Sequence, residues 1–229
     1  MGVRSEFSEA DEQTRKDHGD QRSHEFLMDA LAQARPDDAV LSEEGADDHA
    51  RLDHERVWII DPLDGTREFG ELPRTDWAVH VGLAVGGEPV VGAVALPALD
   101  TTFVTGAGLS LPLPEGGPTR VISSRTRPGP AAEVIAAELE AAVLLRGSAG
   151  AKAMAVVCGE ADVYAHTGGQ YEWDSCAPVA VALATGLHAS RIDGSPLVYN
   201  NANPYVPDLL ICRPELAEAA LGAVERAGL

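Results

Sequence analysis

The chain has 229 residues, of which 45% are hydrophobic, so it is long enough for one large domain or two small domains packed together. Its formal charge is −19, from 17 basic and 36 acidic residues, which disfavours nonspecific binding to nucleic acid or to anionic membranes. No apolar run approaches a membrane-spanning length and no secretory signal is recognised. The three cysteines are far apart without metal-ligand spacing, which favours reduced thiols and a cytoplasmic location.

The first 34 residues combine a polar stretch with a helical pattern. Residues 1–18 contain few large apolar side chains, so we expect a polar N-terminal segment, either mobile or a solvated helix. From Gly19 to Ala34 apolar residues recur at helical spacing, and Asp20 stands at the expected start of this helix. An N-cap role accounts for Asp20 as well as a functional role does.

The most informative stretch is residues 58–69, which read WIIDPLDGTREF. A buried strand is expected to end at Asp61, and Pro62 stiffens the turn, so the carboxylates of Asp61 and Asp64 can be held close together. Close carboxylates repel unless a cation joins them, and oxygen ligands suit Mg²⁺. A helical turn starting near Thr66 would offer free amides to a phosphate. Ordinary turn chemistry also explains Pro-x-Asp-Gly, so partners elsewhere must decide.

Short strands are expected on both sides of this stretch. Residues 39–41 run into Glu43 and Glu44, which a solvated loop would explain if they are taken alone. The remaining strands of the first half are expected at residues 77–85, 89–96 and 101–105, with a Gly-Gly hairpin turn between the first two.

Residues 109–119 are rich in Pro and Gly and mark the expected boundary between an N-terminal half, 19–119, and a C-terminal half, 120–229. The second half alternates strands and helices. Strands are expected at 120–123, 143–145, 161–166 and 209–212, and helices at 131–142, 149–158, 175–185 and 214–227. Ser148 can cap the helix that carries Lys152, and a cap also explains Asp174 at the start of another helix.

Five acidic residues lie at the ends of expected elements, where α/β sheets present functional groups: Asp20, Glu43, Asp61, Asp64 and Asp174. The strings SEE at 42–44, WIIDPLDGT at 58–66 and WD at 173–174 occur in the order found in the inositol monophosphatase superfamily, which the chain resembles from about residue 19 to 212. The resemblance implies a mixed α/β (α+β) fold, a layered αβαβα sandwich as in inositol monophosphatase and fructose-1,6-bisphosphatase. It also implies a Mg²⁺-dependent, lithium-sensitive phosphatase with two or three metal ions.

The resemblance assigns roles to individual residues. A first Mg²⁺ would be held by Glu43, Asp61 and the Leu63 carbonyl. A second would be held by Asp61, Asp64 and Asp174. A third, weaker site would use Asp20 and Glu43. Thr66, with Glu43 or Asp20, would orient and deprotonate the attacking water, whose pKa a nearby metal lowers.

Within the superfamily, the strings TREF at 66–69 and GSAGAK at 147–152 resemble bacterial 3′(2′),5′-bisphosphate nucleotidases. This resemblance implies hydrolysis of the 3′-phosphate of 3′-phosphoadenosine 5′-phosphate or its sulfated analogue, in support of sulfate assimilation. The residues expected to face the substrate are Gly65, Thr66, Ser123, Ser124, Arg125, Ser148 and Lys152. Arg125 or Lys152 would supply the cation for the second phosphate.

Two alternatives stay open at this point. One keeps the fold and changes the substrate to inositol 1-phosphate or fructose 1,6-bisphosphate. The other is a non-catalytic module that binds metal or nucleotide. A homodimer is also left open, and the seven histidines, His80 among them, are interpreted as structural or surface residues.

Overall fold

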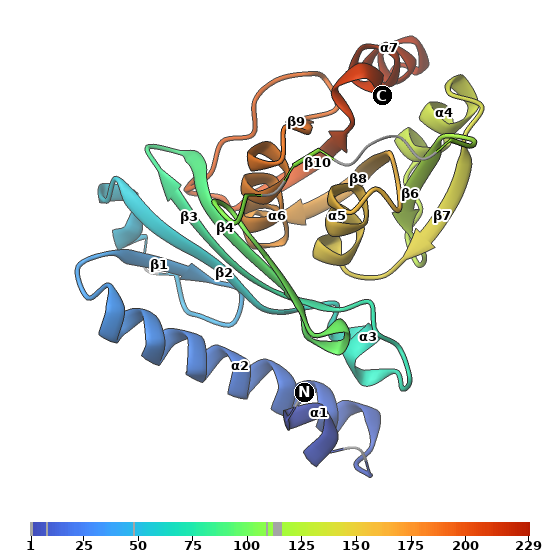
Figure 1. The fold of residues 1–229 in the computed structure, drawn as a ribbon. Coiled ribbons are helices and arrows are strands. Elements are labelled where there is room, and N and C mark those ends of the chain that lie inside the picture. The colour runs from blue at the N-terminus through green and yellow to red at the C-terminus, as the bar shows by residue number, and fades with distance from the viewer. Residues whose placement is uncertain (1, 8, 48, 109, 112–115) are drawn as a thin grey trace.

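The computed structural model describes residues 2–7, 9–47, 49–108, 110–111 and 116–229. Its elements form five layers, helix, sheet, helix, sheet and helix (Figure 1). The layers of helices are α2 (Glu12–Ala34) outside the first sheet, α5 (Ala149–Val157) and α6 (Glu172–Ala184) between the sheets, and α4 (Pro130–Glu138) and α7 (Ala217–Ala227) outside the second sheet. This arrangement confirms the predicted αβαβα sandwich.

The first sheet has the order β1-β2-β3-β4-β5. Its strands are β1 (Ala39–Ser42), β2 (Arg56–Asp64), β3 (Ala78–Val85), β4 (Glu88–Leu96) and β5 (Thr101–Val104). β1 runs parallel to β2, and the other neighbours are antiparallel, with the predicted hairpin between β3 and β4. β2 continues to Asp64 with a register irregularity after Asp61, so the prediction that the strand ends at Asp61 is wrong.

The second sheet has the order β7-β6-β8-β10-β9. Its strands are β6 (Arg120–Ser124), β7 (Ala142–Arg146), β8 (Val163–Tyr171), β9 (His188–Ser190) and β10 (Tyr205–Cys212). Along β10, Leu209 packs into the core shared with α5 and α6, and the next residue, Leu210, packs against α4 and α7. Both faces are therefore covered, which is why the last four residues of this strand, 209–212, are all apolar.

Short elements complete the chain. They are the helices α1 (Gly2–Glu6) and α3 (Thr66–Gly70) and the 3₁₀ turns Ala50–Asp53, Pro97–Leu99 and Pro214–Leu216. Part of the predicted boundary at 109–119 lies outside the described residues, and the division into two halves stays a prediction.

Three local predictions are wrong. The first long helix begins at Glu12 with Asp11 as its cap, so Asp20 lies inside this helix and not at its start. The strand predicted at 161–166 begins at Val163 and extends to Tyr171 as β8. Asp174 is the third residue of α6, where its carboxylate accepts a hydrogen bond from the Tyr171 amide at 2.7 Å. Helix ends are poorly marked in these sequences because several polar residues could cap equally well.

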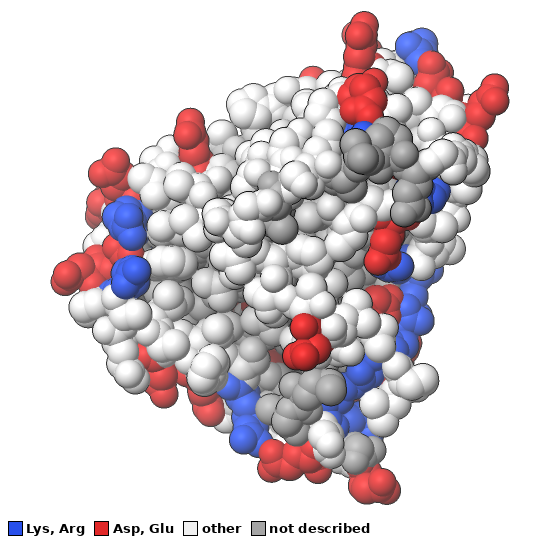
Figure 2. Space-filling view, in the orientation of Figure 1, with Lys and Arg blue, Asp and Glu red and all other residues white. Residues whose placement is uncertain are grey.

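Charge is unevenly distributed over the surface. In the face drawn in Figure 2, acidic side chains lie around much of the rim, and Lys and Arg gather along the lower right edge, where α3 and β7 lie in Figure 1. Among the described residues, no helix is long and apolar enough to cross a membrane.

Gly19 sets how closely α2 approaches the first sheet. A Cβ atom at this position would lie 2.6 Å from Cε1 of Phe69 and 2.8 Å from Cδ2 of Leu63. One turn further on, Ser23 donates a hydrogen bond to the Pro62 carbonyl at 2.6 Å. The absent side chain therefore lets the helix pack directly on the end of β2 and on α3, with Asp20 facing the same region.

Replacing Gly19 tests this packing. Alanine favours a helix over glycine by about 1 kcal/mol, but the clash with Phe69 and Leu63 should reverse the sign. We expect Gly19→Ala to lower the free energy of unfolding by about 1–3 kcal/mol in urea denaturation. Gly222→Ala is the control, because its nearest atom is the flexible end of Arg226, at 3.1 Å, and it should be neutral or stabilising. Equal stabilisation by both substitutions would contradict the packing role.

Candidate active site

Three acidic side chains meet between β2 and the start of α6. One oxygen atom from each of Asp61, Asp64 and Asp174 lies within 4.8 Å of the others. Asp61 and Asp64 come from the end of β2 and are almost fully buried, and Asp174 comes from the first turn of α6. The structure thus brings together the three predicted ligands of the second metal ion.

The electrostatics of this acidic cluster are unfavourable without a cation. Burial, and then the negative charges of Asp64 and Glu43, raise the pKa of Asp61 well above its usual value. Burial and the charge of Asp64 likewise raise the pKa of Asp174 to about 6. In the described part of the chain, no ion pair joins Asp61 or Asp174 to Lys or Arg. The cluster therefore has the charge and the all-oxygen donor chemistry of a divalent metal site.

Asp64 differs from its two neighbours because hydrogen-bond donors surround it. Its carboxylate accepts hydrogen bonds from the hydroxyl of Ser148 and from the amides of Ala149, at 3.0 Å, and Gly150, at 2.7 Å, at the start of α5. Burial alone would raise the pKa of Asp64, but His80, Lys152 and this hydrogen bonding hold the pKa below its usual range. Asp64 is thus ionised and fixed in position.

His80 is a site residue that the sequence interpretation missed. Its ring is fully buried, Nδ1 lies 3.0 Å from the Trp173 carbonyl, and Nε2 lies 3.2 Å from Oδ2 of Asp64. Burial lowers the pKa of His80, but Asp64 outweighs burial and the net shift is upward. A Cβ at Gly150 would lie 2.1 Å from Nε2, so a glycine is required there. The only signal in the sequence is the position of His80 on the strand after the acidic turn, where it pairs with Asp61.

Thr66 and Asp20 form a hydrogen-bonded pair beside the acidic cluster. The Thr66 hydroxyl lies 3.2 Å from Oδ1 of Asp20 and 3.0 Å from the Leu63 carbonyl oxygen. Burial, and then the charge of Glu44, raise the pKa of Asp20 to about 7, although the bond to Thr66 opposes this shift. A carboxyl group with this pKa beside a hydroxyl can accept a proton near neutral pH.

Glu43 lies next to the acidic cluster and also lines the cavity described below. Burial raises the pKa of Glu43 to about 7; the hydrogen bond with Asp61 opposes this shift, and the charges of Asp174, Glu44 and Asp64 add to it. Its backbone amide donates to the Ile60 carbonyl at 3.2 Å, which fixes the chain after β1 alongside β2.

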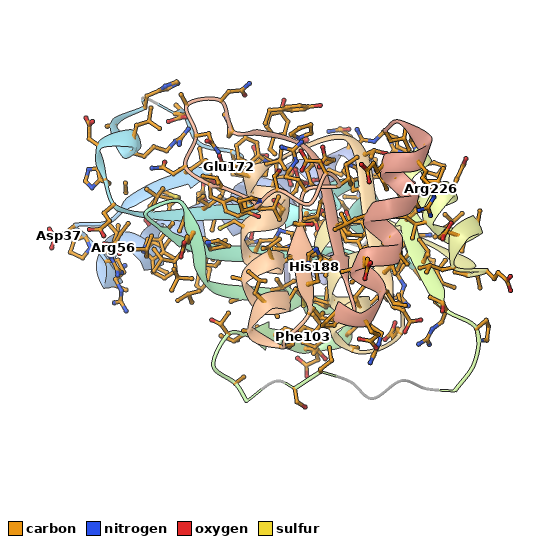
Figure 3. The ribbon with its side chains drawn as sticks, turned by 90° about the horizontal axis from the view of Figure 1, so that it is seen from above. Asp37, Arg56, Phe103, Glu172, His188 and Arg226 are labelled. Atoms are coloured by element: carbon orange, nitrogen blue, oxygen red, sulfur yellow. The ribbon has the colours of Figure 1, made fainter. Side chains whose placement is uncertain are left out.

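A buried network connects the segment after Glu43 to the start of α6. Arg51 donates to Asp47, to the Asn200 side chain at 2.7 Å and to the Asn201 carbonyl at 2.9 Å. Glu172, which lies within the molecule in Figure 3, accepts hydrogen bonds from the amides of Asn200, at 2.7 Å, and Asn201, at 2.8 Å. These contacts hold the segments that carry Glu43 and Asp174 in a fixed relation.

A cavity of about 540 Å³ opens beside the acidic cluster. Eight of the predicted site residues line it: Glu43, Asp64, Gly65, Thr66, Ser124, Ser148, Lys152 and Asp174. Its lining also includes Arg67, Arg127, Tyr164, His166 and Tyr171, which the sequence interpretation did not select. These residues could not be chosen from the sequence, because their local sequence does not distinguish them from ordinary surface arginines or from aromatic residues of a strand.

Lys152 is buried at the base of the cavity, and its substrate role stays a prediction. Its Nζ donates to the carbonyls of Ser148, at 2.6 Å, and Gly147, at 3.3 Å, and lies 5.3 Å from the centre of the Tyr164 ring. Burial lowers the pKa of Lys152, and Asp64 and Asp174 oppose this shift.

Two predicted substrate residues are not brought to the cavity. Ser123 is buried within β6 and is absent from the described lining. Arg125 is also absent from that lining, and its guanidinium binds Glu68 at 2.7 Å and Glu71 at 2.8 Å. The expectation that Arg125 faces the substrate therefore conflicts with where its side chain lies. Its charge is already matched by two carboxylates.

Comparison with known families identifies the class of this protein. Residues 4–229 match the inositol monophosphatase family, and the chain belongs to that family. A solved structure of CysQ from Bacteroides thetaiotaomicron, described as a bacterial member of this family, has a TM-score of 0.74 and 25% identity over 85% of this chain and 83% of that one. A 2′-AMP-bound SaIMPase-II has a TM-score of 0.79 and shares the fold at 20% identity over 98% of this chain and 90% of that one.

Two relatives within the family are similar to this chain in sequence. A 3′-phosphoadenosine 5′-phosphate phosphatase of Mycobacterium tuberculosis is 49% identical over 98% of this chain and 87% of the relative. The 3′(2′),5′-bisphosphate nucleotidase CysQ of Escherichia coli is 29% identical over 77% of this chain and 76% of the relative. The family is metal-dependent, and the acidic cluster with its raised pKa values fits such a metal.

The raised pKa values predict how metal binding depends on pH. Carboxyl groups in the unfolded chain lose their protons near pH 4, whereas Asp20, Glu43 and Asp174 hold theirs to about pH 6–7 in the metal-free fold. The unfolded state binds fewer protons over this range, so the free energy of unfolding falls as pH rises from about 4 to about 7. A metal binds only the ionised carboxylates, so we expect Mg²⁺ to raise the melting temperature more at about pH 8 than at about pH 5.5.

Thermal denaturation with Mg²⁺ and with a chelator measures this difference. Asp174→Asn should remove most of the Mg²⁺-dependent increase. Asp38→Asn is the control, because Asp38 binds Arg56, which Figure 3 places at the far end of the molecule from α7. An equal increase at both pH values, or a wild-type response in Asp174→Asn, would contradict the assignment.

Proposed function

We propose that this chain is a Mg²⁺-dependent phosphatase that hydrolyses the 3′-phosphate of 3′-phosphoadenosine 5′-phosphate or of its sulfated analogue. The observation that carries the proposal is the acidic cluster of Asp61, Asp64 and Asp174 beside the Thr66–Asp20 pair at one end of a cavity. The relatives named as 3′-phosphoadenosine 5′-phosphate phosphatases, at up to 49% identity, support the substrate. A role in sulfate assimilation and sensitivity to lithium belong to the same proposal.

The proposed metal ligands are the cluster carboxylates with Glu43 and the Leu63 carbonyl, and Asp20 with Glu43 for a weaker third site. When bound, Mg²⁺ would offset the charge of the phosphate and lower the pKa of water in the site. All of these groups are oxygen donors, which Mg²⁺ prefers.

The residues of the chain have distinct proposed roles in hydrolysis. Thr66 orients the attacking water and passes its proton towards Asp20, whose pKa of about 7 suits a base. The water oxygen forms a bond to phosphorus, the bond from phosphorus to the ribose 3′-oxygen breaks, and that oxygen takes up a proton. The amides of Gly65 and Thr66 are proposed to hold the phosphate, and Ser124, Ser148 and Lys152 to contact the remainder of the substrate.

Two further parts of the proposal concern the whole protein. The cytoplasmic location expected from the sequence remains a prediction, and a homodimer remains open.

Phosphate release from three substrates tests the function. In Mg²⁺ we expect release from 3′-phosphoadenosine 5′-phosphate to exceed release from inositol 1-phosphate and fructose 1,6-bisphosphate by at least about tenfold in kcat/KM, because only the nucleotide presents two phosphates on one ribose. Asp64→Asn serves as the blank. Preference for a sugar or inositol phosphate would retain the chemistry and overturn the substrate. Absence of release from all three by the folded protein would favour a binding module.

Thr66 variants test the proton-transfer step. Thr66→Ala removes the hydroxyl and should lower kcat by about 10²–10⁴-fold. Thr66→Ser keeps the hydroxyl within reach of Asp20 and is the matched control, with kcat expected within about tenfold of wild type. Similar kcat values for the two variants would show that the hydroxyl does not take part.

A further inference from the structure

The cavity has a cationic part that the proposed hydrolysis does not use. Arg127, His166 and Tyr164 line it, with Lys152 at the base. Burial lowers the pKa of His166, and the charges of Lys152 and Arg127 lower it further, so both cations lie close to the same imidazole. Positive charge therefore gathers in one region of a cavity whose metal end is acidic.

The charge of Arg127 is not matched by the protein. Within the described ranges, its guanidinium forms no hydrogen bond or ion pair, in contrast to the paired guanidinium of Arg125 two residues earlier. Lys152 already donates to two carbonyl oxygens, which leaves one of its three donors. Arg127 thus retains the larger capacity for a new anionic partner.

The loop that carries Arg127 is held against β8. Ser124 Oγ accepts a hydrogen bond from the Arg127 amide at 3.2 Å. Two residues on, a Cβ at Gly129 would lie 2.2 Å from Oγ1 of Thr167, so a glycine is needed for this approach. Because Thr167 follows His166 on β8, the loop keeps Arg127 beside the cationic part of the cavity.

Arg67 also lines the cavity, but it faces a different environment. It belongs to α3, and its charge contributes to lowering the pKa of Glu12 at the start of α2. Arg127, in contrast, lies on the loop after β6, which is held against β8.

We infer that Arg127, with Lys152 below it, binds the second, non-reacting phosphate of a nucleoside bisphosphate and so sets the preference for bisphosphates over monophosphates. This inference rests on the proposed function, which places the reacting phosphate at the acidic cluster. A second phosphate would be repelled by that cluster and needs its own cation. A guanidinium suits this role because it can form two parallel hydrogen bonds to phosphate oxygens.

The test compares two substrates that differ only in the 5′-phosphate, 3′-phosphoadenosine 5′-phosphate and 3′-AMP. The measured quantity is the ratio of their kcat/KM values in Mg²⁺. Arg127→Ala should lower this ratio by about 10- to 100-fold, and Arg127→Lys should restore part of it. Arg125→Ala is the matched control two residues away, and it should leave the ratio at the wild-type value.

Each outcome decides the inference. A wild-type ratio in Arg127→Ala, while the wild-type enzyme prefers the bisphosphate, overturns the inference and leaves the proposed function intact. A lowered ratio in Arg125→Ala alone assigns the second phosphate to Arg125 instead. Equal hydrolysis of both substrates by the wild-type enzyme overturns the inference because no second phosphate is recognised. Failure to release phosphate from either substrate overturns the proposed function, and the inference with it.

Discussion

Repulsion between buried carboxylates is the constraint on which this structure depends. Asp61, Asp64 and Asp174 lie within 4.8 Å of one another in a region with little solvent. Burial, and then the charge of Asp64, raise the pKa values of both Asp61 and Asp174. The fold must therefore hold these carboxylates together rigidly against their mutual repulsion. A bound cation would then relieve the repulsion, which favours cation binding.

Asp64 is the fixed point of this arrangement. It accepts hydrogen bonds from the start of α5 and lies beside His80, and His80 in turn contacts the Trp173 carbonyl at the start of α6. One ionised carboxylate thereby joins the first sheet to both helices of the central layer. Gly150 permits the approach, since any side chain there would meet the His80 ring. The contacts that keep Asp64 ionised are consequently also contacts that pack the layers of the sandwich together.

The cavity separates negative from positive charge. Its acidic end carries the cluster and Glu43, and its cationic part carries Lys152 and Arg127. The chain has a formal charge of −19, which would repel an anionic substrate. Such a substrate therefore needs positive charge placed locally in its binding site. A bound metal and an unpaired guanidinium would provide it at two places, which fits a substrate with two phosphates.

Features of the fold and the site could be predicted when they depend on residues that are neighbours in the sequence. They could not be predicted when they depend on contacts between distant segments. The strand at 58–60 and the helix capped by Ser148 follow from neighbouring residues, and they were predicted. The start of α2 was not, because the first half of this helix has an almost wholly polar sequence and is held by Gly19, whose close approach to Phe69 has no local signal. Sequence patterns report which residues a segment can bury, not which segment it will meet.

The sequence by itself indicated the class of this protein, its layered fold and the members of the acidic cluster, because the order of its short acidic motifs resembles that of a known family and each motif is a local property of the chain. The tertiary structure alone decided that His80 fixes Asp64, that Arg125 is paired with Glu68 and Glu71, and that Arg127 faces the cavity. Arg125 and Arg127 are both arginines of one loop, and only the positions of distant carboxylates distinguish them. The physical reason is that a side chain's charge is free or matched according to what folding places beside it.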